Sequence, residues 1–516
     1  MKRFFISILC VLFLVSACTT NFSINNGSQN TQMQANAQEY WPADDWRTST
    51  PEEQGMDSGL LAGMIDSIRE NGSSVNSITI IRNGYLVCDT YFYPYQKGIK
   101  HAIHSCTKSV TSALAGIAVG DGRIKSVNDA VLDYFPGLDI ANIDQRKQDM
   151  KIKDLLIMSC GVQWSIADDI SSQQMIQTQN WTKFFLDQPM QYEPGSTFMY
   201  CNGAAQALGS ILQKTTGKQP ADFLTEKLNT VVGNTYWYLS PENVNSGQDG
   251  IYMQPDGMAR FGYLYLKNGN WNGRQLVPAQ WVKESTKPQI KTDWGPVFSQ
   301  YGYFWWIPRF GGYAAMGRGG QYIFVIPDLN MVAVFTSGLF KGSDFFYPGE
   351  LMENYILPSV KSQSPLADNT AASEKFQKAV DAVQKAPVPR PAALPETAGL
   401  ISGKTYAMEN SGTITFRFSG GSECAVDLNP QERFIVGLDN NYRLNSTGEL
   451  ISNGMPENHV ALRGRWLNDK TFLIEFQALE EGPEMQYTAT FEDDRIEWRT
   501  ASNEDDAETV VQGRFQ

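Results

Sequence analysis

One apolar helix sets the strongest constraint on how this chain folds. The segment from Ala102 to Gly120 consists mainly of small and apolar residues, and Gly120 supplies a helix stop. Ser105 and Lys108 lie near its start, three residues apart, so their side chains share one helix face. A helix of this composition is expected to be buried. Burial favours the neutral amine of Lys108, which can act as a base.

The start of this helix also suits a nucleophile. A helix N-terminus carries a partial positive charge, which stabilises an alkoxide on Ser105 and disfavours an ammonium on Lys108. The sequence Ser105-Cys106-Thr107-Lys108 therefore has the spacing of a serine that is activated by lysine rather than histidine. Ser-x-x-Lys also occurs by chance in chains of this size, so the interpretation needs partner groups elsewhere.

A second polar cluster is Tyr200-Cys201-Asn202, which follows a Glu-Pro-Gly turn and precedes a helical pattern. On an extended stretch, residues i and i+2 point to the same side, so Tyr200 and Asn202 are expected to line one wall of a cleft. Asn202 also fits the N-cap of the next helix, and the two roles are compatible.

A glycine-rich segment, Met316-Gly317-Arg318-Gly319-Gly320-Gln321, runs into a predicted strand. Glycines at a strand start permit close approach by a ligand, although a plain glycine bulge is the alternative. We expect the backbone N–H groups of Ser105 and Gln321 to form an oxyanion hole for a substrate carbonyl.

In this order, the three segments resemble the motifs of penicillin-recognising serine hydrolases. The nearest groups are the class C β-lactamases and the related D-alanyl-D-alanine peptidases and esterases. The resemblance covers roughly Trp46 to Pro358, and flanking segments at 155–161, 255–262 and 276–281 agree with it. It implies hydrolysis of a small-molecule or peptide substrate through an acyl-enzyme, with no cofactor and no metal.

The resemblance also implies roles for individual residues. Ser105 would be the acylated nucleophile, and Lys108 and Tyr200 would together move the proton, with either of them as the base. Asn202 would hold the substrate amide and orient Lys108. Arg318-Gly319-Gly320 occupies the third motif, where lysine or histidine is usual. Arginine cannot shuttle a proton, but it can bind a carboxylate with both of its terminal nitrogens. This departure also leaves open a non-catalytic sensor or a protein that binds peptidoglycan fragments.

Strand patterns at two distant places predict the architecture of residues 46–360. An Asn83-Gly84 turn joins two strands within 77–87, and a second hairpin covers 322–336. The pattern between them is mainly helical. We therefore expect an α/β (α+β) β-lactamase-like fold, in which an antiparallel sheet is flanked by helices and accompanied by a helical subdomain.

The pattern changes beyond residue 360. A helix around Ser373–Lys385 leads into a proline-rich linker that ends near Pro395, so 361–395 is assigned as a linker. Residues 396–516 show short alternating runs, which predict a separate small all-β barrel or sandwich. This segment carries most of the chain's excess negative charge, and interaction with an unknown partner, ligand capture and capping of the first domain are all open.

The first 17 residues have the pattern of a secretory signal, with Lys2 and Arg3 followed by an apolar run too short to span a bilayer. The run ends in Leu-Val-Ser-Ala before Cys18, which resembles a bacterial lipobox. We expect a lipid anchor on Cys18, a tether over 18–45, and a location on the outer membrane facing the periplasm. Ordinary cleavage near Ala17 is the alternative.

Composition argues against several other functions. The chain has 42 Lys and Arg against 55 Asp and Glu, whereas nucleic-acid binding requires basic patches. Its three histidines, His101, His104 and His459, have no metal-ligand spacing, and a Ser-His-Asp triad is disfavoured because His104 adjoins Ser105. Cys106 and Cys201 lie inside two of the motifs and are expected to be buried free thiols; an approach of the two to each other, if those motifs converge, is the alternative.

Overall fold

The computed structural model describes residues 40–42, 45–295, 297–342, 344–391, 393–409, 412–429, 432–447, 458–504 and 508–515. The predicted signal and the lipid-anchor residue Cys18 lie outside these ranges. Among the described residues, none of the helices combines the length and the apolar character that crossing a membrane would require.

Residues 45–384 form a helix–sheet domain around one eight-stranded sheet. The strand order is β2-β1-β13-β12-β11-β10-β9-β8, and every pairing is antiparallel. The strands are β1 (Val75–Arg82), β2 (Tyr85–Tyr91), β8 (Ile290–Lys291), β9 (Phe298–Tyr301), β10 (Trp306–Pro308), β11 (Tyr313–Gly317), β12 (Gln321–Ile326) and β13 (Met331–Ser337). Because β1 pairs with β13, segments far apart in sequence meet at the centre of the sheet, as predicted.

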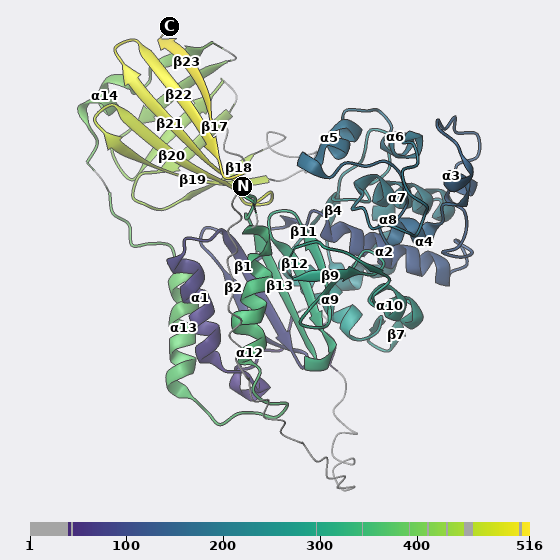
Figure 1. Cartoon of the computed structure of the whole chain (residues 1–516). Coiled ribbons are helices and arrows are strands. Elements are labelled where there is room, and N and C mark those ends of the chain that lie inside the picture. The colour runs from purple at the N-terminus through teal and green to yellow at the C-terminus, as the bar shows by residue number, and fades with distance from the viewer. Residues whose placement is uncertain are drawn as a thin grey trace, which may run out of the picture. The chain divides into compact units, whose positions relative to one another are not determined.

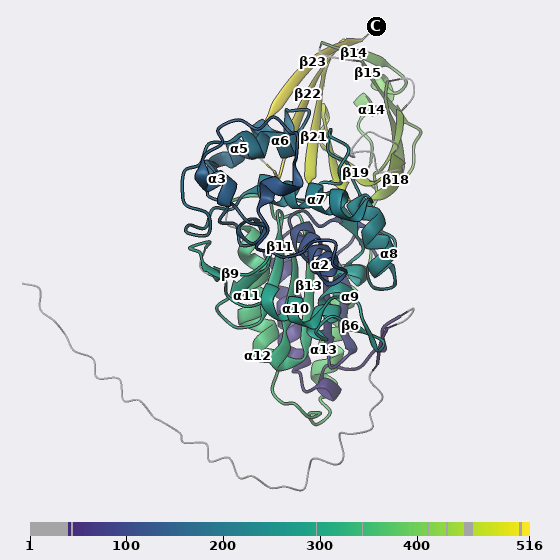
Figure 2. The same ribbon diagram turned by 90° about the vertical axis from the view of Figure 1, so that its right-hand side faces the viewer.

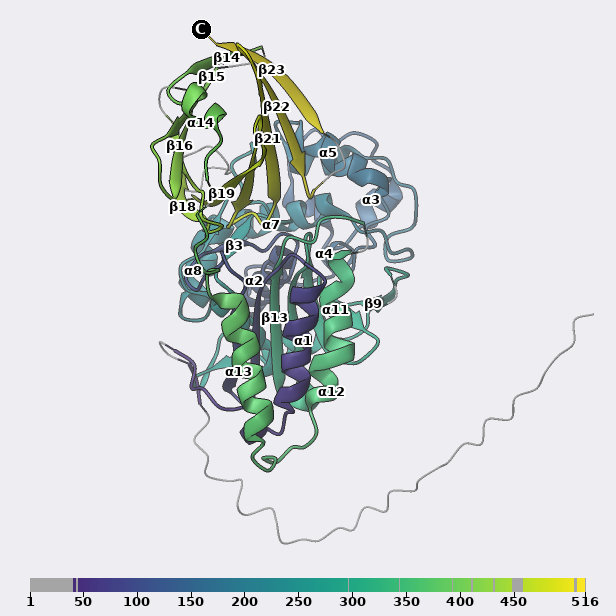
Figure 3. The same cartoon turned by 90° about the vertical axis from the view of Figure 1, so that its left-hand side faces the viewer.

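Both predicted hairpins are present. Asn83 and Gly84 take the positive φ values of 52° and 77° that a tight two-residue turn needs. Every residue of β1, β12 and β13 is buried, because helices cover both faces of the sheet. Figure 3 shows one covering layer, and Figure 2 shows the other from the opposite side. The first layer contains α1 (Ser58–Glu70), α11 (Tyr347–Leu351), a π-helical turn (Met352–Ile356), α12 (Leu357–Ser359) and α13 (Thr370–Gln384); the second contains α2 (Cys106–Gly120), α9 (Pro255–Leu266) and α10 (Ala279–Ser285).

The helix expected within the linker is α13, and it packs against α1 instead of standing apart from the domain. Ser373 on α13 donates a hydrogen bond to the carboxylate of Glu52, and Ala372 lies beside Gly59 on α1. The physical reason is its amphipathic pattern, which buries Phe376, Val380 and their neighbours against the domain.

A helical subdomain is inserted between α2 and α9. Its helices are α3 (Gln145–Asp149), α4 (Ile152–Leu156), α5 (Ile170–Ile176), α6 (Trp181–Asp187), α7 (Asn202–Thr216) and α8 (Pro220–Val232). The smaller elements are β3 (His101–Ala102), β4 (Tyr236–Trp237), β5 (Ile251–Met253), β6 (Asn270–Trp271) and β7 (Arg274–Gln275), with 3-10 turns at Glu52–Gln54, Val131–Tyr134, Ala167–Asp169, Pro327–Leu329 and Asp344–Phe346. α2 packs against α7, so the subdomain meets the helix that begins beside Ser105.

The C-terminal segment forms the expected all-β domain, a barrel preceded by α14 (Glu396–Ile401) (Figure 1). Its strands are β14 (Thr405–Met408), β15 (Thr413–Phe418), β16 (Glu423–Leu428), β17 (Glu432–Gly437), β18 (Arg443–Thr447), β19 (Asn458–Asn468), β20 (Thr471–Ala478), β21 (Glu484–Glu492), β22 (Arg495–Ser502) and β23 (Thr509–Phe515). The sheet runs β17-β16-β15-β14-β23-β22-β21-β20-β19-β18, and a pairing between β17 and β19 closes it.

Candidate active site

Ser105 lies at the junction between a sharp turn and α2. It is the residue immediately before the helix, with φ −65° and ψ −6°, and it is half-buried. The preceding His104 has φ 44°, a value that costs energy for a residue with a β-carbon. The turn is held by hydrogen bonds from the N–H of Cys106 to the oxygen of Ile103 and from the N–H of Thr107 to the oxygen of His104. This turn places the Ser105 hydroxyl at the positive end of α2.

Lys108 is almost completely buried, with 1% of its surface exposed, and it faces Ser105 as predicted from the spacing. Its Nζ lies 2.8 Å from Ser105 Oγ and 2.8 Å from the backbone oxygen of Gln248. Burial lowers the pKa of Lys108 to about 8, and the nearby carboxylates of Asp249 and Asp169 oppose that shift. A substantial fraction of the amine is therefore neutral near pH 8 and able to accept a proton from Ser105.

Tyr200 completes the group of three. The Ser105 hydroxyl forms a hydrogen bond with the phenol, while burial raises the pKa of Tyr200 well above its usual value. Lys108 Nζ lies 4.9 Å from the centre of the Tyr200 ring. The ring itself is fixed between Trp294 and Trp306, at centroid distances of 5.3 and 5.7 Å. The structure thus brings the predicted serine, lysine and tyrosine to one point.

Asn202 occupies a different environment from the one that the sequence suggested. It is the first residue of α7 and makes no capping hydrogen bond, so the N-cap interpretation is wrong; Cys201 stands at that position. Its Nδ2 donates to Ser172 Oγ on α5 at 2.9 Å, and its Oδ1 is buried without a hydrogen-bond partner among the described residues. A buried acceptor of this kind is available to a donor on a bound ligand.

The third motif forms the turn between β11 and β12. Gly319 and Gly320 take φ values of 74° and 83°, which residues with a β-carbon rarely adopt. Gln321 begins β12, and its side chain bonds to the oxygens of Arg318 and Ser337 at 3.2 and 2.6 Å. This local network holds the turn in a fixed position.

The turn also lies against the start of α2. The Cys106 thiol donates to the backbone oxygen of Gln321 at 3.4 Å, and a β-carbon on Gly317 would meet the oxygen of Ile103 at 2.4 Å. Gln321 therefore stands beside the residues that flank Ser105, which is the arrangement that an oxyanion hole built from these two segments requires.

Arg318 points away from this network and is largely exposed. Its guanidinium lies 5.3 Å from the centre of the Phe340 ring, and Nη2 is 3.4 Å from the carboxylate of Glu504 in the loop after β22. Arg318 therefore has an acidic partner, which sequence inspection did not reveal because Glu504 lies in a distant segment without a motif.

The histidines near Ser105 are not suited to act as bases. Burial lowers the pKa of His104 to about 3 and that of His101 to about 4, so both rings are neutral at ordinary pH. The His104 ring packs edge-on against Phe340, and His101 Nε2 lies 3.0 Å from Asn76 Nδ2. Their environments agree with the expectation that His104 diverges from Ser105.

The two cysteines of the motifs agree with the expectation of buried free thiols. The thiol of Cys106 interacts with Gln321, whereas the thiol of Cys201 forms a hydrogen bond with Cys160. Both of these cysteines are buried and free. The reason is geometric: Cys201 lies on the side of its segment opposite Tyr200, so it faces the residues after α4 instead of α2.

A sequence model of the family described as Beta-lactamase matches residues 61–351, which is more than half of the chain. The chain belongs to the beta-lactamase family. An uncharacterized protein from Alkalihalophilus pseudofirmus is 24% identical over 191 residues, covering 30% of this chain and 56% of that protein. Protein flp from Staphylococcus aureus is 27% identical over 195 residues, covering 35% of this chain and 38% of that protein. The match thus spans about half or less of these curated relatives.

Two solved structures show the same fold. A putative 6-aminohexanoate-dimer hydrolase from Bacillus anthracis superposes with a TM-score of 0.52 at 20% identity, covering 64% of this chain and 89% of that one. A putative beta-lactamase from Bacteroides dorei gives a TM-score of 0.50 at 18% identity, covering 60% of this chain and 100% of that one.

In this beta-lactamase family member, sequence reasoning missed the loop that supports Lys108. Gln248 supplies its backbone oxygen, and Asp249 accepts hydrogen bonds from the hydroxyls of Tyr238 and Ser246. No motif marks this loop, and its only signal is a short polar stretch with glycines before β5. Backbone groups leave no trace in residue identity, so the contact became visible only in the structure.

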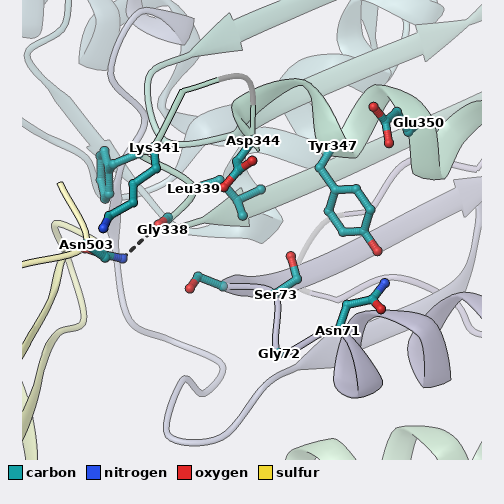
Figure 4. A pocket seen from close by; sticks show the side chains of 12 residues that line it. Asn71, Gly72, Ser73, Gly338, Leu339, Lys341, Asp344, Tyr347, Glu350 and Asn503 are labelled. Atoms are coloured by element: carbon teal, nitrogen blue, oxygen red, sulfur yellow. Dashed lines mark hydrogen bonds between the residues drawn. The ribbon is translucent and has the colours of Figure 1, made fainter. Parts of the chain in front are cut away.

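Figure 4 shows a pocket of about 370 Å³ that borders the third motif through Phe340. It is lined by residues that follow α1 and β13, including Ser73, Asp344 and Tyr347, together with Asn503. Ser105, Lys108 and Tyr200 are not among its lining residues, so the candidate active site rests on side-chain geometry and not on this pocket.

Proposed function

We propose that this chain is a serine hydrolase that cleaves an amide, ester or lactam carbonyl through a covalent acyl-enzyme. The observation that carries the proposal is the 2.8 Å contact between Lys108 Nζ and Ser105 Oγ in a setting that lowers the pKa of the lysine to about 8. A buried amine with this pKa can take up the proton of a serine hydroxyl near neutral pH.

In the proposed acylation, Ser105 Oγ attacks the substrate carbonyl carbon while its proton passes to Lys108 Nζ. The backbone N–H groups of Ser105 and Gln321 stabilise the resulting oxyanion. The Tyr200 hydroxyl, which is hydrogen-bonded to Ser105, passes a proton to the leaving group and recovers one through Lys108. Its raised pKa keeps the phenol protonated, and this supports a role as a proton carrier over one as the resting base.

Deacylation reverses these steps with water in place of the leaving group. Water loses a proton to the same lysine–tyrosine pair and attacks the ester carbon, which releases the acid product and restores Ser105. Asn202 Oδ1, which has no hydrogen-bond partner in the part of the chain that the structure describes, is proposed to accept a hydrogen bond from the N–H of an amide substrate. Arg318 is proposed to bind a substrate carboxylate, in competition with Glu504.

The test is covalent labelling followed by turnover. A fluorophosphonate or a fluorescent penicillin should add one adduct mass to the intact protein, and the adduct should be absent from Ser105→Ala. Ser112→Ala is the matched control, because this serine is buried on the same helix and its hydroxyl makes no hydrogen bond with any of the described residues. A Ser105→Ala protein with full hydrolytic activity would refute the proposal.

The substrate class follows from a parallel assay of nitrocefin, p-nitrophenyl esters and D-alanyl-D-alanine peptides on one preparation. A 6-aminohexanoate dimer joins this set because the structurally similar Bacillus anthracis protein carries that substrate in its name. The class with the highest kcat/KM that is also lost in Ser105→Ala identifies the physiological bond type.

A second candidate is a non-catalytic sensor or a protein that binds peptidoglycan fragments. It is favoured by arginine at position 318, where the family resemblance leads us to expect lysine or histidine. Single acylation without release of product supports the sensor, and multiple turnovers exclude it.

The location is proposed separately. A lipid on Cys18 would hold the protein on the outer membrane, facing the periplasm, after removal of residues 1–17. Fractionation of the producing cells tests this proposal: the full-length protein should partition with membranes, and Cys18→Ala should release it to the soluble envelope fraction. Equal partitioning of both forms would contradict it.

A further inference from the structure

The barrel contains an apolar cavity that the proposed hydrolysis does not use. Its volume is about 350 Å³, and the described side chains that line it are all hydrophobic or aromatic. Representative lining residues are Val426, Phe434, Met485, Tyr487 and Trp498. This volume falls within the range of natural small-molecule sites, which are mostly apolar concavities of about 300–1,000 Å³.

The cavity lies inside the barrel, as the alternation along β16 shows. Val426 and Leu428 line it, whereas Asp427 between them forms ion pairs with Arg417 and Arg433 on the outer surface. Successive side chains of a strand point to opposite faces, so Val426 and Leu428 face the interior while Asp427 faces outward.

Barrel size alone does not explain the cavity, because large aromatic side chains on strands of the same barrel pack tightly elsewhere in its interior. Phe416, Phe418, Trp466, Phe472 and Phe491 pack ring against ring, with centroid distances between 5.2 and 6.3 Å. The strand β15 runs from the open part into this packed part. The sequence thus provides large side chains at one end of the barrel and leaves space at the other.

The open part can be reached from solvent. Leu428, Met485, Tyr487 and Trp498 line the cavity, yet each is only partly buried. The Tyr487 ring stacks on Trp498 at 5.2 Å, and its hydroxyl lies 3.3 Å from Met485 Sδ. Because none of the described residues that line the cavity is charged, an uncharged group is the part of a ligand that fits inside it.

We propose that the barrel binds the alkyl chain of a medium-length fatty acid, with the carboxylate left at the partly exposed mouth. An apolar cavity of about 150 Å³ holds one benzene ring, so this cavity accommodates about twice as many carbon atoms, or about twelve. A flexible chain adapts to the irregular lining formed by methionine and aromatic side chains. The inference is independent of the proposed hydrolysis, since it concerns only residues of the barrel.

The test is calorimetric titration of the full chain with octanoate, dodecanoate and hexadecanoate, each below its micelle concentration. We expect dodecanoate to bind with one-to-one stoichiometry and more tightly than octanoate, with no further gain for hexadecanoate. Val426→Trp should weaken binding at least tenfold by filling the cavity. Ala425→Trp is the matched control, because it lies one residue earlier on the same strand and points outward, and it should bind within twofold of the natural protein.

Two further variants keep the outcome decisive. Ser105→Ala should retain binding, which separates the barrel from the candidate active site. If circular dichroism shows that Val426→Trp does not fold, Leu428→Trp at the mouth takes its place. Unchanged affinity in the folded filling variant, equal affinity for all three chain lengths, or no heat of binding up to the solubility limit would overturn the proposal.

Discussion

Replacing Lys108 by methionine should raise stability and abolish activity, and the pH dependence of the gain follows from the structure. Burial lowers the pKa of this lysine from 10.5 to about 8. Each pKa unit corresponds to about 1.4 kcal/mol, so charging Lys108 inside the fold costs about 3 kcal/mol. Methionine has a similar length and carries no charge, so Lys108→Met removes that cost.

The sign of the effect depends on pH. Below pH 8 the lysine is protonated in both the folded and the unfolded chain, so the buried charge lowers the free energy of unfolding of the natural protein by its full amount. Between pH 8 and 10.5 the unfolded chain binds more protons than the folded one, so the stability of the natural protein rises with pH. Above pH 10.5 the amine is neutral in both states and the cost disappears. The advantage of Lys108→Met should therefore shrink by about 3 kcal/mol from pH 7 to above pH 10.5.

Paired urea unfolding of the two proteins from pH 7 to 10.5 measures this difference, because contributions from other titrating groups cancel. The methionine leaves the backbone oxygen of Gln248 without its partner, which costs about 1–3 kcal/mol at every pH. This cost lowers the difference in unfolding free energy by the same amount at each pH, so the dependence of that difference on pH does not change. Lys378→Met, at an exposed lysine on α13, is the matched control and should give a flat difference. A flat difference for Lys108→Met as well would refute the reasoning.

The same pKa should appear in kinetics. If neutral Lys108 is the base, kcat/KM of the natural protein rises with pH through about 8 and then levels off. The stability of the natural protein should begin to rise with pH at about the same pH as the kinetic midpoint. Agreement between these two values would assign the kinetic and the stability effect to Lys108. A kinetic midpoint near 6 would instead point to a different base.

Three other substitutions test separate parts of the structure. Tyr200→Phe should lower kcat by about 10²–10⁴-fold while leaving the melting temperature nearly unchanged, because the ring keeps its stacking on Trp306; steady-state kinetics and a thermal melt measure the two effects. Gly116→Ala should destabilise the protein by about 1–3 kcal/mol, measured by urea unfolding, because its β-carbon would lie 2.3 Å from the Trp281 ring. Burial raises the pKa of Glu481 from 4.5 to about 7, so stability should fall as pH rises from 4.5 to 7, and Glu481→Gln should flatten that part of the stability profile.

The sequence was sufficient to predict the elements whose signals are local. The Asn83-Gly84 turn, the alternating runs of the barrel and the helix that starts beside Ser105 all appear in the structure. In each case a few adjacent residues determine the backbone conformation, and the tertiary contacts agree with that local preference.

Local signals failed where the partner is distant or belongs to the backbone. Asn202 fits an N-cap by residue type, but the chain enters α7 one residue earlier and turns the amide towards Ser172. Arg318 could be placed in a motif, but its pairing with Glu504 depends on how the loop after β22 is positioned. A single sequence contains no information of this kind about residues that are far apart in the chain.

The pKa of Lys108 depends both on its local position in the apolar helix and on contacts with residues far away in the sequence. A lysine buried in the first turn of an apolar helix is unfavourable for folding, and one backbone oxygen and two carboxylates at a distance offset that cost only in part. Full neutralisation by a direct carboxylate partner would stabilise the fold and would keep the amine protonated, so it could no longer accept the serine proton. The incomplete compensation seen here is therefore what a lysine base requires. It predicts that removing one of these carboxylates, as in Asp249→Asn, should lower the kinetic pKa and raise kcat/KM at neutral pH. A variant with unchanged kinetics would show that the amine is not the base.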